Sequence, residues 1–136
     1  MANYLATSRT NHFRVTDEDK YAELFNHLIS EDFIEDFTEE RDGVLYHGFG
    51  TYGSIDYKVA EEDGSDFDTF LKEIQAILPE DEAFIYTEVG HEKLRCVTGV
   101  SIVCTNTELK SMSLSSWALN QAKQILGDDF STQMDF

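Results

Sequence analysis

Residues 16–42, TDEDKYAELFNHLISEDFIEDFTEERD, place 11 carboxylates and two cations around a regular set of large apolar residues. The apolar residues recur at intervals of three and four, at Tyr21, Leu24, Phe25, Leu28 and Ile29. This spacing predicts one apolar stripe on a helix. Thr16 is the expected N-cap, with Asp19 three residues on as in a capping box. The stretch therefore predicts folded structure with a strongly negative outer face.

The negative charge is concentrated in one part of the chain. The formal net charge is −17, from 27 Asp and Glu against 10 Lys and Arg. Residues 17–92 hold 23 of these acids and four of the cations, a local balance of −19, whereas the remainder nets +2. A magnitude of about 2–8 is enough to keep a small domain soluble, and the excess costs stability through self-repulsion. The excess indicates a basic protein partner, bound cations or a high-salt environment.

The same field opposes direct binding to nucleic acid or to an anionic membrane, because phosphate contacts require Lys and Arg. No run of about 18 apolar residues, the length that spans a bilayer, occurs in the sequence. Cys96 and Cys104 match no CxxC or metal-binding spacing, and free thiols suit a reducing compartment. We therefore expect a cytoplasmic protein.

Length and composition predict a single domain over residues 1–136. A chain of 136 residues can bury a core without disulfides or metals. Hydrophobic residues make up 41% of the chain and aromatic residues 12%, so the acidity does not come with the apolar poverty of disordered proteins. The chain should fold.

Periodicity and turn signals place the other elements. We expect strands at residues 3–15, 33–38, 44–50, 83–89, 94–105 and 108–113. Residues 55–59 could add another short strand, and residues 33–38 could instead extend the first helix. The first strand is expected at a sheet edge, where Arg9 and Arg14 would stay hydrated. Asp42-Gly43 predicts a hairpin turn, and residues 90–93 predict another.

Two further helices follow from apolar stripes and caps. The second is capped by Ser65 or Asp66 and ends before Pro79. The last is capped by Ser113 or Ser115 and ends at Gly127. Its residues expected to face inward are Trp117, Ala118, Ala122, Ile125 and Leu126. The order β-α-β-β-α-β-β-β-α predicts an α+β domain, an antiparallel sheet covered by about three helices.

The chemical motifs are weak. Gly48, Gly50 and Gly53 match GxGxxG, but no helix or positive charge follows, so we expect a glycine-rich strand end or bulge. The four histidines show no metal-ligand spacing, and residues 63–74 do not match a calcium loop. No nucleophile signature such as GxSxG is present. We expect no metal, no cofactor and no enzymatic activity.

The acidic residues themselves are the candidate partner-binding site. They come in blocks on predicted structure: Asp17, Glu18, Asp19, Glu23, Glu31, Asp32, Glu35, Asp36, Glu39, Glu40, Glu61, Glu62, Asp63, Asp66 and Asp68. Folded carboxylates can reproduce the phosphate array of a duplex, with one charge per about 1.7 Å of axis. Aromatic residues exposed between them would mark the contact surface, with core packing as the default assignment of Phe33, Phe37, Tyr46, Tyr52 and Phe67.

Three segments, MANYLATSRTNHFRVTD (1–17), HGFGTYGSIDY (47–57) and VGHEKLRCVTG (89–99), resemble a family of small acidic, largely uncharacterised proteins of mobile elements and phages. In charge and size the chain is also similar to DNA-mimic inhibitors of restriction enzymes and CRISPR nucleases. The resemblance carries no catalytic motif. It implies a non-enzymatic anti-CRISPR or anti-restriction inhibitor.

The expected function is therefore to block the DNA-binding groove of a Cas nuclease, or of another basic nucleic-acid-binding defence protein, by phosphate mimicry. A second hypothesis is an intracellular immunity or regulatory module that binds a basic protein without competing with DNA. A third, weaker one is a nucleotide-binding or enzymatic domain that uses residues 48–53.

Overall fold

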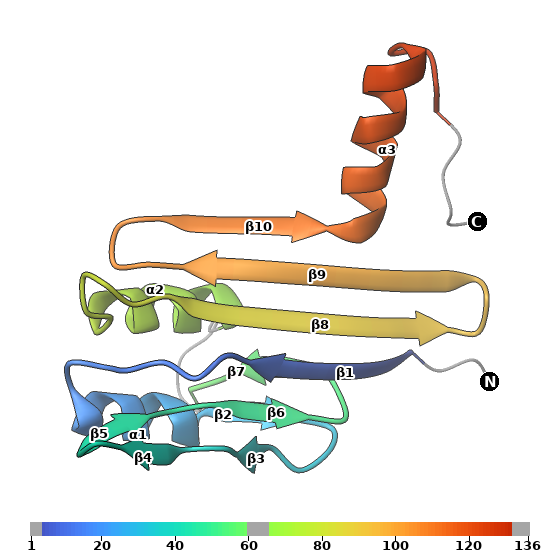
Figure 1. Ribbon diagram of the computed structural model, residues 1–136. Helices are drawn as coiled ribbons and strands as arrows, with labels where there is room; N and C mark the ends of the chain where they lie inside the picture. Colours follow the sequence, from blue (N-terminus) through green and yellow to red (C-terminus); the bar gives the residue numbers. More distant parts are fainter. Residues whose placement is uncertain (1–3, 60–65, 132–136) are drawn as a thin grey trace.

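The computed structural model describes residues 4–59 and 66–131 and has the predicted α+β fold (Figure 1). The strands are β1 Leu5–Thr10, β2 Leu28–Ser30, β3 Glu35–Asp36, β4 Glu39–Arg41, β5 Val44–Tyr46, β6 Phe49–Thr51, β7 Ile55–Tyr57, β8 Phe84–Glu92, β9 Cys96–Cys104 and β10 Leu109–Ser113. The helices are α1 Glu18–Asn26, α2 Phe67–Ala76 and α3 Leu114–Leu126. More short strands are present than the sequence predicts.

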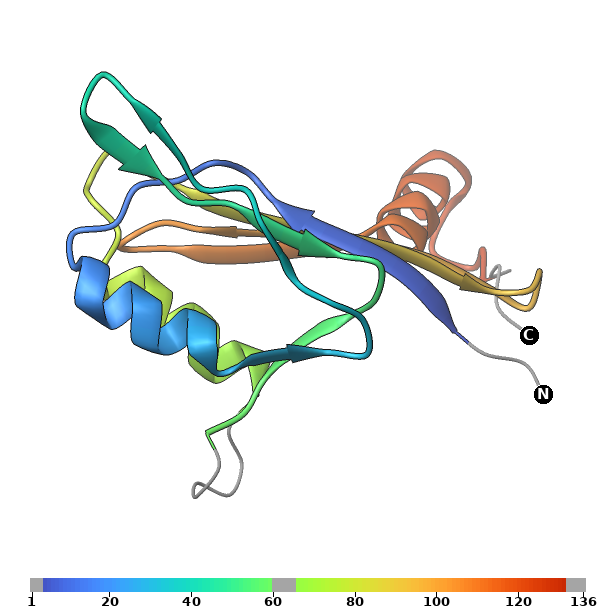
Figure 2. The same cartoon turned by 90° about the horizontal axis from the view of Figure 1, so that it is seen from below.

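One antiparallel sheet of six strands organises the domain, in the order β10-β9-β8-β1-β6-β3. Two smaller antiparallel pairs, β2–β7 and β4–β5, complete the strands. Helices α1 and α2 lie on one face of the sheet, as the two views agree (Figures 1 and 2). The core lies between these helices and the sheet, and its fully buried aromatic residues are Phe13, Phe49, Phe70 and Phe84.

The two covering helices begin at local sequence signals. Asp17, one residue after the predicted cap, accepts a hydrogen bond from the backbone N–H of Lys20. Thr16 instead donates its hydroxyl to the carbonyl of Ile77, at the end of α2. Asp66 caps α2 by accepting from the N–H of Thr69. Each of the two helices therefore begins at an aspartate whose carboxylate caps its first turn.

Strand β1 lies inside the sheet, so the prediction of an edge strand was wrong. It pairs with β8 on one side and with β6 on the other. Its residues alternate, with Ser8 and Thr10 buried and Arg9 exposed on the opposite face. Arg9 stays hydrated because of the face it occupies, and its guanidinium lies 5.2 Å from the ring centre of Phe37.

The turns follow the predicted pattern in one hairpin and differ in the other. Asp42 and Gly43 join β4 to β5 with φ values of 51° and 79°, the positive values that favour an Asp-Gly turn. The second turn occupies residues 93–95 rather than 90–93, because Gly90, His91 and Glu92 continue the pairing of β8 with β9. The β8–β9 ladder is therefore longer than the sequence indicates.

The last helix does not cover the core. Ser113 caps α3 and Gly127 ends it, as the sequence predicts. No residue of α3 is buried, however, so the prediction that Trp117, Ala118, Ala122, Ile125 and Leu126 face inward was wrong. The helix leaves the end of β10 and stands beyond this edge strand (Figure 1), on the side of the sheet away from α1 and α2 (Figure 2).

The sheet face turned away from α1 and α2 is called the outer face below. Strand register places on it six exposed apolar residues: Leu5, Ile85, Val89, Val97, Val103 and Met112.

Within residues 4–59 and 66–131, no helix has the length and hydropathy needed to cross a membrane.

Candidate functional site

The predicted carboxylates that the structure describes are all exposed to solvent. Glu61, Glu62 and Asp63 lie outside the described residues. The other twelve are exposed, and ten of them form what we call the acidic surface: Asp17, Glu18, Asp19, Glu23, Glu31, Asp32, Glu35, Asp36, Glu39 and Glu40. The remaining two, Asp66 and Asp68, begin the neighbouring helix α2. The acidic surface covers α1, the segment from β2 to β3, and β4.

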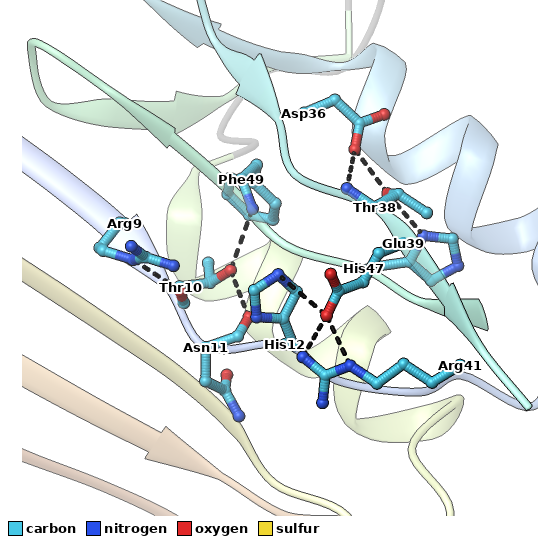
Figure 3. A network of polar contacts seen from close by, with 10 residues as sticks. All are labelled: Arg9, Thr10, Asn11, His12, Asp36, Thr38, Glu39, Arg41, His47 and Phe49. Atoms are coloured by element: carbon cyan, nitrogen blue, oxygen red, sulfur yellow. Dashed lines mark hydrogen bonds and ion pairs between the residues drawn. The ribbon is translucent and has the colours of Figure 1, made fainter. Parts of the chain in front are cut away.

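Buried His47 links the carboxylates of α1 to those of β3 and β4. Its Nε2 lies 2.7 Å from Oε1 of Glu18 on α1, and its Nδ1 lies 3.1 Å from the Thr38 hydroxyl. Thr38 in turn donates to the carboxylate of Asp36 (Figure 3). The ring of Tyr21 stacks on the imidazole at 4.1 Å. The start of α1 is therefore held against the connection between β3 and β4.

The sequence did not reveal this role of His47, one of the four histidines without metal-ligand spacing. Its side chain is 7% exposed, and its partner Glu18 is 29 residues away along the chain. No motif or periodic pattern links the two positions. The antiparallel bridge between Phe13 and His47 brings residue 47 close to the start of α1. This pairing is a feature of the tertiary structure and is not signalled by the sequence.

The cations within the acidic surface are already paired. The ammonium of Lys20 lies 3.8 Å from Glu23 and 3.4 Å from Glu73. Arg41 pairs with Glu39, which also has His12 at 4.0 Å (Figure 3). Seven carboxylates of the acidic surface have no ion pair among residues 4–59 and 66–131: Asp17, Asp19, Glu31, Asp32, Glu35, Asp36 and Glu40. The charge of these seven is not compensated by a cation of the described chain.

Two of the five candidate aromatic residues are exposed beside this charge. The ring of Phe33 is 78% exposed and that of Tyr52 is 70% exposed. The Thr51 hydroxyl donates to the carbonyl of Phe33 over 3.0 Å, so the segments that carry the two rings are hydrogen-bonded neighbours. A shallow groove beside Phe33 is lined by Phe25, Asn26, Leu28, Ile29, Ser30, Asp32, Phe33 and Ile34.

The other three aromatic residues are not available as anchors. Phe37 lies under the guanidinium of Arg9, and Tyr46 lies under that of Arg41 at 4.9 Å. Phe67 stacks on Phe70 at the edge of the core. Phe33 is therefore the best placed apolar contact of the acidic surface, because it directly follows Glu31 and Asp32 in the chain.

The GxGxxG segment is strand β6 and its flanks, as the glycine-rich strand interpretation predicts. Gly50 lies between β1 and β3, and a Cβ placed there would lie 2.8 Å from the carbonyl oxygen of Ser8. A Cβ at Gly53 would lie 3.0 Å from the Glu31 side chain. The chain continues into strand β7 rather than a helix. Close packing explains Gly50 and Gly53 without a bound phosphate, and the Glu31 carboxylate would repel a phosphate at this position.

The two cysteines are free, and both lie on the core side of β9 by strand alternation. Cys104 is fully buried, and burial raises the pKa of its thiol. Within the part of the chain that the structure describes, no three His, Cys, Asp or Glu side chains are grouped to hold a metal ion.

Tyr21, below His47, supports a stability prediction. Its buried hydroxyl has no hydrogen-bond partner among the described residues. We expect Tyr21→Phe to raise the free energy of unfolding by about 1 kcal/mol, because a buried unpaired polar group is removed. Urea unfolding followed by circular dichroism measures the change.

Tyr86→Phe is the matched control, because the Tyr86 hydroxyl donates to Glu88 over 2.8 Å. We expect this variant to lower the free energy of unfolding by about 1–2 kcal/mol.

Burial, with Asp36 and Glu18 adding to it, raises the pKa of Tyr21 above its ordinary value of 10.0. The unfolded chain therefore loses this proton first, and stability falls as pH rises above about 10. Tyr21→Phe should reduce this alkaline loss. A less stable Tyr21→Phe variant would contradict the unpaired hydroxyl.

No protein-family model, curated protein or solved structure matches this chain. Function is therefore inferred from the exposed carboxylates, their fixed arrangement around His47, and the exposed ring of Phe33.

Proposed function

We propose that the protein is a non-enzymatic inhibitor that binds a basic, nucleic-acid-binding defence protein, with the DNA-binding groove of a CRISPR effector nuclease as the leading target and restriction enzymes as the next. The observation that carries the proposal is the acidic surface: ten exposed carboxylates on folded elements, seven of them without an ion pair among the described residues. The resemblance of three segments to proteins of mobile elements is consistent with this role.

The arrangement supports mimicry of a nucleic acid more than a loose acidic tail would. The bond between Glu18 and His47 anchors one group of carboxylates on α1, and the pairing of β3 with β6 positions Glu35 and Asp36. Charges held in place can enter a groove of Lys and Arg without the ordering cost that a flexible segment pays. The electrostatic attraction would raise the association rate, and Phe33 would slow dissociation.

The same surface supports the second candidate, an immunity or regulatory module that binds a basic protein and leaves its DNA site open. The exposed rings of Phe33 and Tyr52 would serve this candidate as well, because apolar anchors stabilise a contact with any protein partner. Both candidates place the protein in the cytoplasm with its target. Neither assigns it a metal, a cofactor or a reaction.

Charge reversal tests the acidic surface. We expect the combined variant with Glu31, Asp32, Glu35 and Glu40 each changed to Lys to bind a basic nuclease at least about tenfold more weakly, because four attractive charges become repulsive. Binding should also become less sensitive to salt, as fewer counterions are displaced. Surface plasmon resonance at two salt concentrations, with DNA competition on the captured nuclease, gives both readouts.

The matched control reverses four exposed carboxylates outside the surface: Asp56, Glu80, Glu108 and Asp128. Each reversal adds two charges, so both variants change the formal net charge from −17 to −9. The control should bind within about threefold of the wild type, since long-range attraction is screened at physiological salt. Equal losses in both variants would mean that net charge alone drives binding. A retained nuclease that still binds DNA would support the regulatory candidate.

A further inference from the structure

Beyond its first residues, helix α3 has no packing partner within residues 4–59 and 66–131. None of its 13 residues is buried, and Trp117 and Ile125 are 52% and 80% exposed. A helix of this length is marginal in water by itself and is stabilised in proteins by packing its apolar side. The apolar residues of α3 therefore require a cover that the described part of the chain does not supply.

The outer face of the sheet is the second uncovered apolar surface. Leu114, the first residue of α3, lies against β9, because a Cβ at Gly99 would meet its Cδ1 at 2.5 Å. Val89 and Met112 line a small apolar hollow beside Leu114. The rest of the helix stands beyond β10 (Figure 1). One chain thus exposes both an apolar helix and an apolar sheet face that the helix does not reach.

The position of α3 indicates how both surfaces could be covered at once. Strand β10 is the last strand of the sheet, and its free edge pairs with no other strand within residues 4–59 and 66–131. A second sheet joined antiparallel at this edge would extend beneath α3, on the outer side. A two-fold axis would repeat the contact in both directions.

We propose that two copies of this chain associate at the β10 edge, with α3 of each copy covering the outer face of the other.

The distribution of charge selects a second copy as the occupant. Residues 96–126 contain three charged side chains, Glu108, Lys110 and Lys123, with a balance of +1, whereas residues 17–92 carry −19. Two copies would repel one another across their acidic surfaces. The side formed by β9, β10 and α3 is the one on which they can meet without that repulsion. A basic partner would instead be drawn to the acidic surface.

The uncovered area is large enough for a stable dimer. The six apolar residues of the outer face and four of α3 are each between 37% and 80% exposed. Together they offer on the order of 800 Å² per copy, the contribution of one partner to an interface of standard size. The dimer would carry its two acidic surfaces away from the interface, so this inference does not depend on the function proposed for them.

Sedimentation velocity of the full chain tests the dimer, with the fluorescence of Trp117 as a second readout. Trp117 is the one tryptophan in the sequence and lies within the proposed interface. We expect a species of twice 15.5 kDa. Dilution should shift the Trp117 emission to longer wavelength as the dimer dissociates. Ile125→Glu should weaken the dimer at least about 100-fold, because it places a charge in the apolar contact.

Phe33→Glu is the matched control, since Phe33 and Ile125 are 78% and 80% exposed and the same charge is introduced. It should leave dimerisation unchanged. A monomer at all concentrations up to about 100 μM would overturn the proposal. A dimer that Ile125→Glu does not weaken, or whose Trp117 emission does not change on dilution, would overturn it as well. Neither result would bear on nuclease binding, which the charge reversals measure separately.

Discussion

Replacing Phe84 with alanine is expected to lower the free energy of unfolding by about 3–5 kcal/mol, the usual cost of removing a fully buried phenyl ring. Phe84 is 0% exposed. Its ring makes edge-to-face contacts with Phe13 at 5.0 Å and with Phe70 at 5.9 Å. It therefore joins β8 to the segment after β1 and to α2, and the cavity would open at the centre of the core. A typical domain has only about 5–15 kcal/mol to lose.

Urea unfolding followed by far-ultraviolet circular dichroism, at one fixed protein concentration, measures this loss. Phe33→Ala is the control, because Phe33 is 78% exposed and should change stability by no more than about 0.5 kcal/mol. If Phe84→Ala lost less than about 1 kcal/mol, the core would not be assembled around this ring. If Phe33→Ala lost as much, the ring would not be a free surface anchor.

Replacing Gly50 with valine is expected to cost about 1–3 kcal/mol or more, because the side chain has no room between β1 and β3. A Cβ at this position lies 2.8 Å from the carbonyl oxygen of Ser8, 3.0 Å from the Cβ of Arg9 and 3.2 Å from the ring of Phe37. The nearest of these atoms belongs to the backbone and cannot move aside without shifting β1. Thermal unfolding measures the effect as a lower melting temperature.

Gly43→Asn is the control for a glycine in open space. Its φ is +79°, which Asn tolerates, and no atom lies within 4 Å of the added Cβ. Its cost should stay below about 1 kcal/mol. A Gly50→Val variant that kept its melting temperature but lost a nucleotide-induced stabilisation would restore the phosphate-binding hypothesis for residues 48–53. A loss of stability without any nucleotide response would support close packing.

The elements that the sequence predicted best depend on signals within a few residues. The Asp66 cap and the apolar stripe of α2 lie inside one segment, so local propensity decides them. The same is true of the Asp42-Gly43 turn and of the start and end of α3. The first helix was predicted too long, because Leu28 and Ile29 continue its apolar spacing but pair with β7 as strand β2. There a tertiary pairing overrode a local pattern.

Where an element lies in the sheet depends on partners far along the chain. The prediction for β1 treated Arg9 as a sign of an edge, although alternation across one face accounts equally well for an exposed arginine. Only the pairing of β1 with β6 and β8 shows that it is an inner strand. The apolar spacing of α3 likewise predicted a buried side, but spacing does not say what covers that side.

By itself, the sequence determined the α+β class, the acidity of residues 17–92 and the exposure of the twelve described candidate carboxylates, because capping, periodicity and the cost of burying charge act locally. The tertiary structure alone decided that His47 joins Glu18 to the β3–β4 connection, that Phe33 and Tyr52 are the exposed rings, and that α3 stands off the sheet. Those features depend on contacts between segments that are distant in the chain. Strand pairing and side-chain packing determine such contacts, and local sequence signals do not.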